Sequence, residues 1–330
     1  MKTWVSHTAG GPDTLVLEDR PMPAPGANDV LVRVEAVGIN FPDGLLIRDL
    51  YQVKPARPLV PGSEFAGTVI QVGSSVTSIE VGDAVIGRCG WGAMCEFMAI
   101  AEGRCVVIPK SLPRIEAAAF LFAYATAFHA LQDAGSLREG QRLLVLGAAG
   151  GVGSAAVEVG KALGATVCAA ASSQAKVDFA VAKGADTSIV YRSDLQRPED
   201  QKAFGTQLKE IAPEGFDVVF DPVGGGYAEP AVRSLARGGR HLVVGFTAGI
   251  PKLPLNLALL KSASIVGVDW RMFVQEHPEA NTANVRSLLN LWQKNKIQPQ
   301  VTEVFPFGRA PDAIARIESR EVLGKIVVEV

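Results

Sequence analysis

Short apolar runs rich in β-branched residues alternate with longer segments of helical pattern from Arg142 onward. The runs fall at residues 142–147, 165–171, 187–191, 216–221, 241–245 and 264–269. Apolar runs separated by helices are typical of parallel strands, because both faces of a parallel sheet are covered. Several helical segments end in Gly just before the next run, which is how a left-handed cap ends a helix. The alternation predicts an α/β fold with a doubly wound, Rossmann-type sheet of six parallel strands.

The first part of the chain has a different pattern. Short alternating strands, among them DVLVRVEAVGI and EFAGTVIQVG, are separated by Gly, Pro and Asp turns. This pattern is typical of an irregular antiparallel unit. A last strand pattern, GKIVVEV, ends the sequence, and we expect it to return to that unit. We therefore predict a mostly-β domain of residues 1–122, completed by 270–330, and a doubly wound domain of residues 123–269.

A glycine-rich turn, LGAAGGVGSAA, joins the first strand of the doubly wound region to an amphipathic helix. In such a turn Gly150 lets the backbone approach a pyrophosphate, and Gly153 lets the helix pack closely on the strand. Free N–H groups at the start of the helix face the anion. The context of strand, turn and helix favours a dinucleotide site over the alternative that the glycines serve helix packing only. The predicted binding residues are Ala149, Gly150, Gly151, Val152 and Gly153.

The residues after the second strand indicate which dinucleotide is bound. An acidic residue at this place would bind the 2′-hydroxyl of NAD, and the chain has none there. It has Ser172, Ser173 and Lys176, which suit a 2′-phosphate because they supply donors and positive charge. We therefore predict NADPH. Tyr191 and Arg192, at the end of the third strand, could flank the same phosphate, although a Tyr at a strand end is as often ordinary packing.

Composition excludes several other classes of function. The net charge is −2 and no run of Lys and Arg occurs, so a nucleic-acid partner is not expected. The amino terminus has no apolar core of signal-peptide length. The richest apolar stretch, IEAAAFLFAYATAFHAL, contains Glu116 and His129 and is typical of a buried helix rather than a membrane span. We expect a soluble, cytoplasmic protein with no membrane partner.

The spacing of Cys and His does not predict a structural metal site. The cysteines form no CxxC pair, and the histidines show no HxxxH or HExxH spacing. Buried thiols that pack as small apolar groups are the simpler interpretation. The residues concerned are Cys89, Cys95, Cys105, Cys168, His7, His129, His241 and His277.

Several motifs in order resemble the zinc-independent quinone oxidoreductase branch of the medium-chain dehydrogenase/reductase superfamily. The resemblance covers essentially the whole chain and rests on NFPDGLLIRDLYQVKP, PGSEFAGTVIQVGSSV, GDAVIG, AAGGVGSAAVEVGKALGA, ASSQAKVDFAVAKGA, FDPVGG, GGRHLVVGF and GKIVV. It implies a GroES-like catalytic domain, a Rossmann domain, NADPH and a homodimer, for which the edge strands HLVVG or SIVGVD are the candidate interface. It also implies that Thr126, Gly245 and Phe246 lie beside the nicotinamide and Lys325 near the cofactor. For Thr126 and Phe246, core packing is the alternative.

The resemblance also bears on catalytic zinc. In zinc-dependent members, a Cys, a His-Glu pair and a further Cys surround the metal. Here Asn40 stands at the first place, Ser63 stands before Glu64, and Tyr124-Ala125-Thr126 covers the last. Amide, hydroxyl and methyl groups do not form the shell that zinc prefers. We therefore predict that no metal takes part.

Without a Lewis acid, substrates that accept hydride readily are favoured. A quinone, or an alkene conjugated to a carbonyl, spreads the arriving charge itself, so the protein has mainly to align the reactants and donate hydrogen bonds. The candidate catalytic residues are Asn40, Asp43 and Tyr51, although Asn40 could simply form a turn and Asp43 could cap a helix. We predict an NADPH-dependent quinone oxidoreductase. The alternatives are an NADPH-dependent reductase of α,β-unsaturated carbonyls or enoyl thioesters, and an NADPH-binding protein with a structural or regulatory role.

Overall fold

The computed structural model describes all of residues 1–330 and divides into two compact units. The first unit comprises Met1–Phe122 and Pro299–Val330, and the second comprises Ala123–Gln298. The second unit therefore extends further along the chain than the expected boundary at residue 269. The reason is side-chain contact: His129 stacks on Phe273 with 4.0 Å between ring centroids, and the Asn284 amide donates to Asp133 at 2.8 Å.

The second unit contains the predicted sheet of six parallel strands. Its strand order is β10-β9-β8-β11-β12-β13, and each neighbouring pair is parallel. The order reverses between β8 and β11, so this is a doubly wound sheet and the fold prediction is confirmed. The strands are β8 (Arg142–Leu146), β9 (Thr166–Ala171), β10 (Thr187–Val190), β11 (Phe216–Asp221), β12 (Leu235–Val243) and β13 (Ser264–Gly267).

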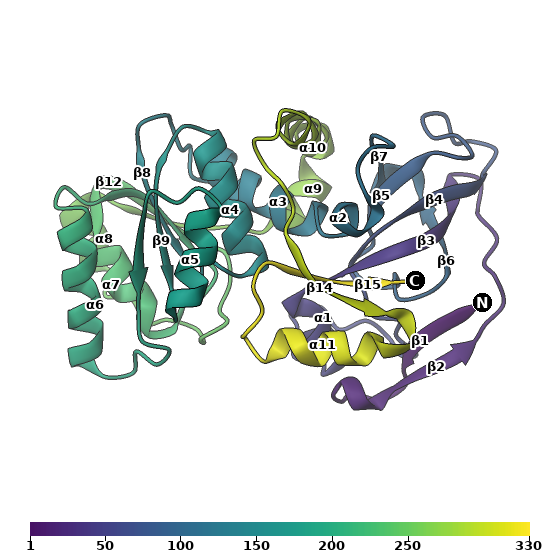
Figure 1. The fold of residues 1–330 in the computed structure, drawn as a ribbon, viewed down its shortest axis with the longest axis horizontal. Helices are drawn as coiled ribbons and strands as arrows, with labels where there is room; N and C mark the ends of the chain where they lie inside the picture. Colours follow the sequence, from purple (N-terminus) through teal and green to yellow (C-terminus); the bar gives the residue numbers. More distant parts are fainter. The chain divides into compact units, whose positions relative to one another are not determined.

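Helices cover both faces of this sheet. In Figure 1, α4 (Gly151–Ala162) and α5 (Gln174–Ala182) lie on one face, and α6 (Pro198–Ile211), α7 (Ala228–Arg233) and α8 (Asn256–Lys261) lie on the other. The core beneath α6 and α7 contains Leu144, Phe204 and Phe216, all buried. The other helical segments of this part of the chain are α3 (Leu121–Phe128), the π-helix η3 (His129–Ala134), η4 (Gly225–Tyr227), α9 (Trp270–Glu276) and α10 (Pro278–Gln293).

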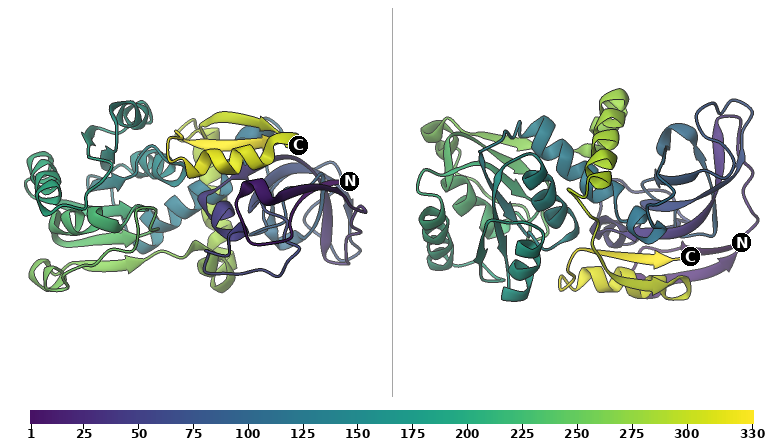
Figure 2. Two further views of the ribbon diagram at one scale, coloured as in Figure 1. Left: turned by 90° about the horizontal axis from the view of Figure 1, so that it is seen from below. Right: turned by 45° about the horizontal axis from the view of Figure 1, so that its top comes forward.

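The first unit is built on a larger, mostly antiparallel sheet. Its order is β14-β15-β3-β4-β5-β7, with β6 paired to β3, and β1 and β2 form a separate two-stranded sheet. The carboxyl-terminal strand β15 pairs antiparallel with β3 and parallel with β14. Both views in Figure 2 show this yellow segment beside the purple amino-terminal strands. The strands are β1 (Lys2–Ser6), β2 (Leu15–Asp19), β3 (Asp29–Ile39), β4 (Glu64–Val72), β5 (Ala84–Arg88), β6 (Phe97–Ala101), β7 (Cys105–Val107), β14 (Val301–Pro306) and β15 (Lys325–Glu329).

Alternating apolar residues on β3, β4 and β15 bury one core in this unit. Val30, Val32 and Val34 on β3 are each at most 2% exposed, and Ile314 of α11 packs into the same core. The residues between them are largely buried too, among them Leu31 on β3 and Val327 on β15, so these strands are covered on both faces over much of their length. No helix of the chain is both long and apolar enough to cross a membrane. The helical segments of this unit are η1 (Pro12–Thr14), α1 (Phe41–Ile47), η2 (Glu102–Arg104), α2 (Arg114–Ala118), η5 (Phe307–Arg309) and α11 (Ala310–Glu318).

Candidate functional site

The glycine-rich turn after β8 contains two glycines with different roles. A Cβ added at Gly153 would lie 2.1 Å from the carbonyl oxygen of Gly147, so only glycine allows α4 to pack this closely on the turn. A Cβ added at Gly150 would meet only that same oxygen, at 3.5 Å, so Gly150 faces open space. Gly147 itself has φ +59°, a left-handed conformation that favours glycine. The turn is therefore both a packing device and an exposed backbone surface.

The amino terminus of α4 has the donors that an anion requires. Gly150 is its N-cap residue and provides no side-chain cap, while the N–H of Ser154 is the first to bond back, to the Gly150 carbonyl at 2.8 Å. The N–H groups of Gly151, Val152 and Gly153 precede that bond and have no intrahelical acceptor. Together with the positive end of the helix dipole, they fit a pyrophosphate.

The polar residues after β9 divide into two groups. Lys176 Nζ donates to Ser172 Oγ at 3.1 Å, so this hydroxyl and this ammonium lie together at the carboxyl end of the strand. Ser173 instead caps α5, because its Oγ accepts the N–H of Lys176 at 3.4 Å. Ser172 and Lys176 thus form one polar pair that could bind a phosphate, while Ser173 also starts the helix.

Tyr191 lies in the core of the second unit. Its side chain is 7% exposed, and its ring packs against Phe204 and Tyr227 with centroid separations of 5.6 and 4.6 Å. Burial raises the pKa of the Tyr191 phenol well above its usual range. The packing interpretation of Tyr191 therefore has geometric support, whereas its neighbour Arg192 is an exposed residue paired at 3.5 Å with Asp200.

The loops that follow β11 and β12 are joined by hydrogen bonds. The Gly225 N–H donates to the Gly249 carbonyl at 2.7 Å, and the Ala248 N–H donates to the Val223 carbonyl at 2.8 Å. Gly245 and Phe246 lie in the second of these loops, and the Phe246 side chain is 49% exposed. These loops extend from the carboxyl ends of neighbouring parallel strands, next to the point where strand order reverses, which is where ligands bind in doubly wound sheets.

A buried contact between a histidine and a carboxylate beneath these loops was not anticipated from the sequence. His241 Nε2 lies 3.1 Å from Asp221 Oδ2, and the two side chains are 1% and 3% exposed. The signal that could have found it is positional, since FDPVGG and GGRHLVVG end adjacent strands of the predicted sheet. The pairing itself depends on register, with His241 opposite Val219 and Asp221 opposite Val243.

Thr126 lies in α3 and is 9% exposed. Two residues earlier on the same helix, the Tyr124 hydroxyl donates to Glu158 of α4. Glu158 also pairs with Lys183 at 3.1 Å, and both of these charged side chains are 9% exposed. Lys183 in turn donates to the Gln298 carbonyl at 2.8 Å. The pair of Glu158 and Lys183 therefore connects α3 and α4 to Gln298, the last residue of the second unit.

In the first unit, Lys325 is at the centre of a buried polar cluster. Its Nζ lies 2.5 Å from Asn40 Oδ1, 2.9 Å from Glu64 Oε1 and 3.0 Å from the Ile39 carbonyl. All three ammonium protons therefore have acceptors. Asn40 Nδ2 donates to Glu64 Oε1 at 2.9 Å and to Ser63 Oγ at 3.2 Å. The amide of Asn40 is thus bonded at both ends inside the unit.

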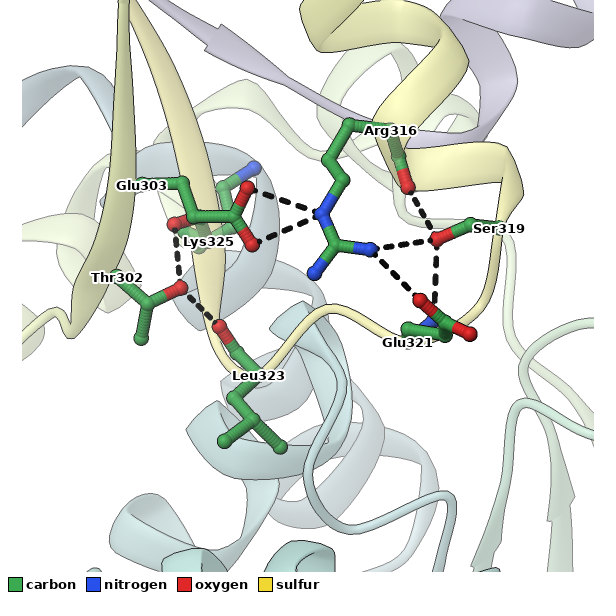
Figure 3. Close-up of polar contacts among 7 residues, drawn as sticks. All are labelled: Thr302, Glu303, Arg316, Ser319, Glu321, Leu323 and Lys325. Atoms are coloured by element: carbon green, nitrogen blue, oxygen red, sulfur yellow. Dashed lines mark hydrogen bonds and ion pairs between the residues drawn. The ribbon is translucent and has the colours of Figure 1, made fainter.

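A network on α11 and the adjoining loop holds the start of β15, which carries Lys325. Arg316 Nε donates to both carboxylate oxygens of Glu303, at 3.1 and 3.0 Å, and its Nη1 donates to Ser319 Oγ at 3.0 Å (Figure 3). Thr302 Oγ donates to the Leu323 carbonyl, which closes the loop just before the strand (Figure 3). Thr302 Oγ also lies 3.5 Å from the Lys325 carbonyl oxygen, so this network reaches the backbone of Lys325.

The cluster around Lys325 does not fit zinc. Its donors are one amide, one hydroxyl and one carboxylate, and the carboxylate oxygen Glu64 Oε1 already accepts an ammonium proton. A zinc shell of imidazole and thiolate groups cannot be assembled from Asn40, Ser63 and Glu64. No group of three or more His, Cys, Asp or Glu side chains anywhere in the chain is arranged to hold a metal ion.

Asp43 lies beside this cluster and is fully buried. Its Oδ2 accepts the Asn40 N–H at 2.7 Å, in the position of a helix-capping residue at the start of α1. No group meets hydrogen-bond geometry at its Oδ1, although the neighbouring Ser63 side chain also acts to lower the pKa of this carboxyl. Burial raises the pKa of Asp43 to about 7, against the opposing effects of the Asn40 N–H and the Lys325 ammonium. Tyr51 lies in the loop after α1 and is partly exposed.

The four thiols are free. Burial raises the pKa of Cys168 to about 11 and those of Cys95 and Cys105 to about 12. Since the thiolate is the reactive form, burial disfavours reaction at these three cysteines at neutral pH.

Comparison with known proteins finds matches to both parts of the chain. Residues 26–110 match the family model of the alcohol dehydrogenase GroES-like domain, and residues 151–285 match that of zinc-binding dehydrogenases. The bovine quinone oxidoreductase-like protein 2 is 36% identical over 317 residues, covering 95% of this chain and 88% of the bovine protein.

Solved structures agree with these matches over the full chain. The Escherichia coli quinone oxidoreductase complexed with NADPH has a TM-score of 0.90 at 27% identity, with 100% of both chains covered. The CurK enoyl reductase has a TM-score of 0.87 at 28% identity, covering 99% of this chain and 98% of that one.

Proposed function

This chain belongs to the medium-chain dehydrogenase/reductase superfamily, in its quinone oxidoreductase branch, and on that premise we propose that it is an NADPH-dependent quinone oxidoreductase that works without metal. The observation that carries the metal-free part of the proposal is the Lys325 ammonium, bonded to Asn40 and Glu64 where zinc-dependent members would place ligands. A quinone delocalises the incoming negative charge and so needs no Lewis acid.

The second unit supplies groups that suit NADPH. The N–H groups of Gly151, Val152 and Gly153 would hold the pyrophosphate. The pair formed by Ser172 and Lys176 would hold the 2′-phosphate, because an ammonium and a hydroxyl favour a doubly charged anion over a neutral ribose hydroxyl. The bound cofactor supplies a hydride. In support, the Escherichia coli relative of this fold is an NADPH complex.

The loops after β11 and β12 would form the nicotinamide end of the site. We place Gly245 and Phe246 there because these loops follow the strands next to the reversal point. Phe246 is 49% exposed, which leaves its ring free to pack on a ligand. Thr126, at 9% exposed, is better suited to packing within α3.

The first unit would orient the acceptor. Because both ends of the Asn40 amide are already bonded, we propose a positioning role for Asn40 and for Lys325. Asp43 caps α1 and so fixes the segment that leads to Tyr51. Tyr51 is then the candidate that donates a hydrogen bond or a proton to the reduced acceptor, since its phenol lies on a partly exposed loop.

A reductase of α,β-unsaturated carbonyls or enoyl thioesters is the second candidate. The CurK enoyl reductase, at 28% identity and a TM-score of 0.87, favours it. The two activities share hydride transfer to a conjugated acceptor and differ in the size and charge of the substrate. A binding protein without catalysis is the third candidate, and it requires NADPH binding with no acceptor reduced.

We also propose that the protein forms a homodimer in the cytoplasm. Strand β13 is at the edge of its sheet, and large apolar side chains are exposed on it and on the segment before it. They are Ile250 (82% exposed), Leu255 (75%), Leu259 (80%), Leu260 (68%) and Ile265 (37%). The four free cysteines suit a reducing compartment.

The test is NADPH oxidation with a panel of acceptors, followed at the nicotinamide absorbance. We expect turnover with 1,4-benzoquinone or 9,10-phenanthrenequinone, and a lower kcat/KM with enones and acyl-CoA esters. Turnover of enoyl thioesters alone would establish the second candidate. NADPH binding without oxidation by any acceptor would establish the third.

A further inference from the structure

The pair formed by Asp221 and His241 has no part in the reaction as proposed, yet it lies beneath the loops assigned to the nicotinamide. The ring nitrogen His241 Nε2 is 3.1 Å from Asp221 Oδ2. The other carboxylate oxygen, Asp221 Oδ1, accepts the N–H groups of Val223 and Gly224, both at 2.8 Å. One buried carboxylate therefore joins a strand residue to the turn after β11.

That turn needs such a fixed acceptor. Gly224 and Gly225 have φ values of +68° and +52°, so the backbone here takes a left-handed course that is held by its hydrogen bonds. A Cβ added at Gly224 would lie 2.7 Å from the Gly249 carbonyl oxygen, which shows how closely the two loops approach each other. The position of the turn therefore determines the position of the 245–249 loop and of Phe246.

A histidine at position 241 lowers the stability of the folded state unless its hydrogen bond has a function. With Nε2–H donating to Asp221, the second ring nitrogen Nδ1 is buried and has no partner. An unpaired buried acceptor is unfavourable, and an aliphatic side chain would fill a place in β12 without that cost. At 1% exposure the imidazole cannot reach a substrate, so its role must act through Asp221.

We propose that His241 is a positioning residue for the cofactor: by donating to Asp221 it fixes the 222–225 turn, and through the paired loops it holds Phe246 where the nicotinamide binds. This inference rests on the proposed function. It differs from the roles of Ser172 and Lys176, which lie after β9 and concern the 2′-phosphate. Loss of the His241 donor should weaken the binding of NADPH and the binding of NADH by the same factor.

The test compares three variants with the wild type. His241→Leu removes the donor, His241→Gln retains an amide donor, and Leu208→Ala deletes a fully buried side chain of α6 from the core of the same unit, at a position outside both loops in the sequence. Dissociation constants for NADPH and NADH are measured by fluorescence titration, together with kcat, KM and Tm. We expect His241→Leu to raise both dissociation constants and the NADPH KM at least tenfold. His241→Gln should stay within threefold of wild type, and Leu208→Ala should lower Tm with dissociation constants within twofold.

Several results would overturn the inference. In one, His241→Leu lowers Tm as Leu208→Ala does but binds both nucleotides like the wild type, so that the pair is merely structural. In another, His241→Leu weakens the binding of NADPH but not the binding of NADH. Should His241→Leu not fold, His241→Met provides a second variant without a donor. Hydrogen exchange on the wild type gives an independent answer: NADPH must slow exchange at Val223, Gly224 and residues 245–249, and unchanged exchange there rejects the idea. Failure of the wild type to bind either nucleotide would instead reject the proposed function itself.

Discussion

The Lys325 ammonium lies 2.9 Å from the Glu64 carboxylate inside the sheet of the first unit, and the two side chains are 4% and 1% exposed. The same carboxylate accepts the Phe122 N–H at 2.8 Å through its second oxygen, at the start of α3. Within the first unit, Glu64 thus joins β4 and β15 to the backbone of Phe122, and the Lys325 ammonium balances its charge.

Removal of that cation should be strongly destabilising. Lys325→Met leaves the Glu64 carboxylate buried without its counter-charge, and we expect a loss of about 3–5 kcal/mol in the free energy of unfolding. Urea denaturation measures it. The matched control is Lys2→Met, which breaks the exposed pair with Asp19 at 2.7 Å. This substitution should not measurably change the free energy of unfolding. Equal effects of the two substitutions would contradict this account of the cluster.

Substitution of Lys176 should alter cofactor preference. Lys176→Ala removes the ammonium next to Ser172, so NADPH binding should weaken at least tenfold while NADH binding changes little. The control is Lys209→Ala on α6. Fluorescence titration with both nucleotides provides the measurement, and an equal loss for the two would remove the argument for a 2′-phosphate site.

The two glycines of the turn should respond differently to alanine. Gly153→Ala places a Cβ 2.1 Å from the Gly147 carbonyl oxygen and should cost about 1–3 kcal/mol of stability. Gly150→Ala meets no such obstacle within the protein, so stability should be kept while NADPH affinity falls. Gly103→Ala, with no atom within 4 Å of the added Cβ, is the control. Thermal unfolding and NADPH titration on the three variants separate the roles, and similar behaviour of Gly150→Ala and Gly153→Ala would show that they share one role.

Asp43 should make stability fall as the pH rises. Its pKa is about 7 in the folded chain against 3.8 as the ordinary value, so the folded state binds the proton more tightly. The stabilisation is complete below pH 3.8 and is lost as the pH rises through 7. Asp43→Asn lacks this proton equilibrium. Between pH 4 and pH 8 the wild type should therefore lose up to roughly 4 kcal/mol relative to the variant in urea denaturation. If the free energies of unfolding of the two proteins changed in parallel with pH, the raised pKa of Asp43 would be refuted.

The exposed leucines near β13 provide a test of assembly. Leu259→Glu places a charge in the apolar patch, and we expect the dimer to dissociate to monomers in sedimentation velocity experiments. Leu17→Glu, on β2 of the first unit and 39% exposed, is the control and should leave the assembly unchanged. A wild-type protein that sediments as a monomer would rule out the dimer.

Local pattern was enough to determine the architecture of the second unit. Six apolar runs separated by helices determine six parallel strands, because the period of a strand or helix is a property of neighbouring residues. The glycine turn was recognisable for the same reason, since Gly147, Gly150 and Gly153 act within a few residues of one another.

Only the tertiary structure decided which side chains meet. The ammonium of Lys325 lies beside Asn40 because β15 pairs antiparallel with β3, and Asp221 meets His241 because of the register between β11 and β12. Ser172 and Ser173 look equivalent in the sequence, but helix capping uses the second and leaves the first beside Lys176. Residues 270–298 join the second unit through contacts of α9 and α10 that no local period encodes. Periodicity depends on neighbours along the chain, whereas a site depends on register between distant strands, and that register is set by burial of the whole core.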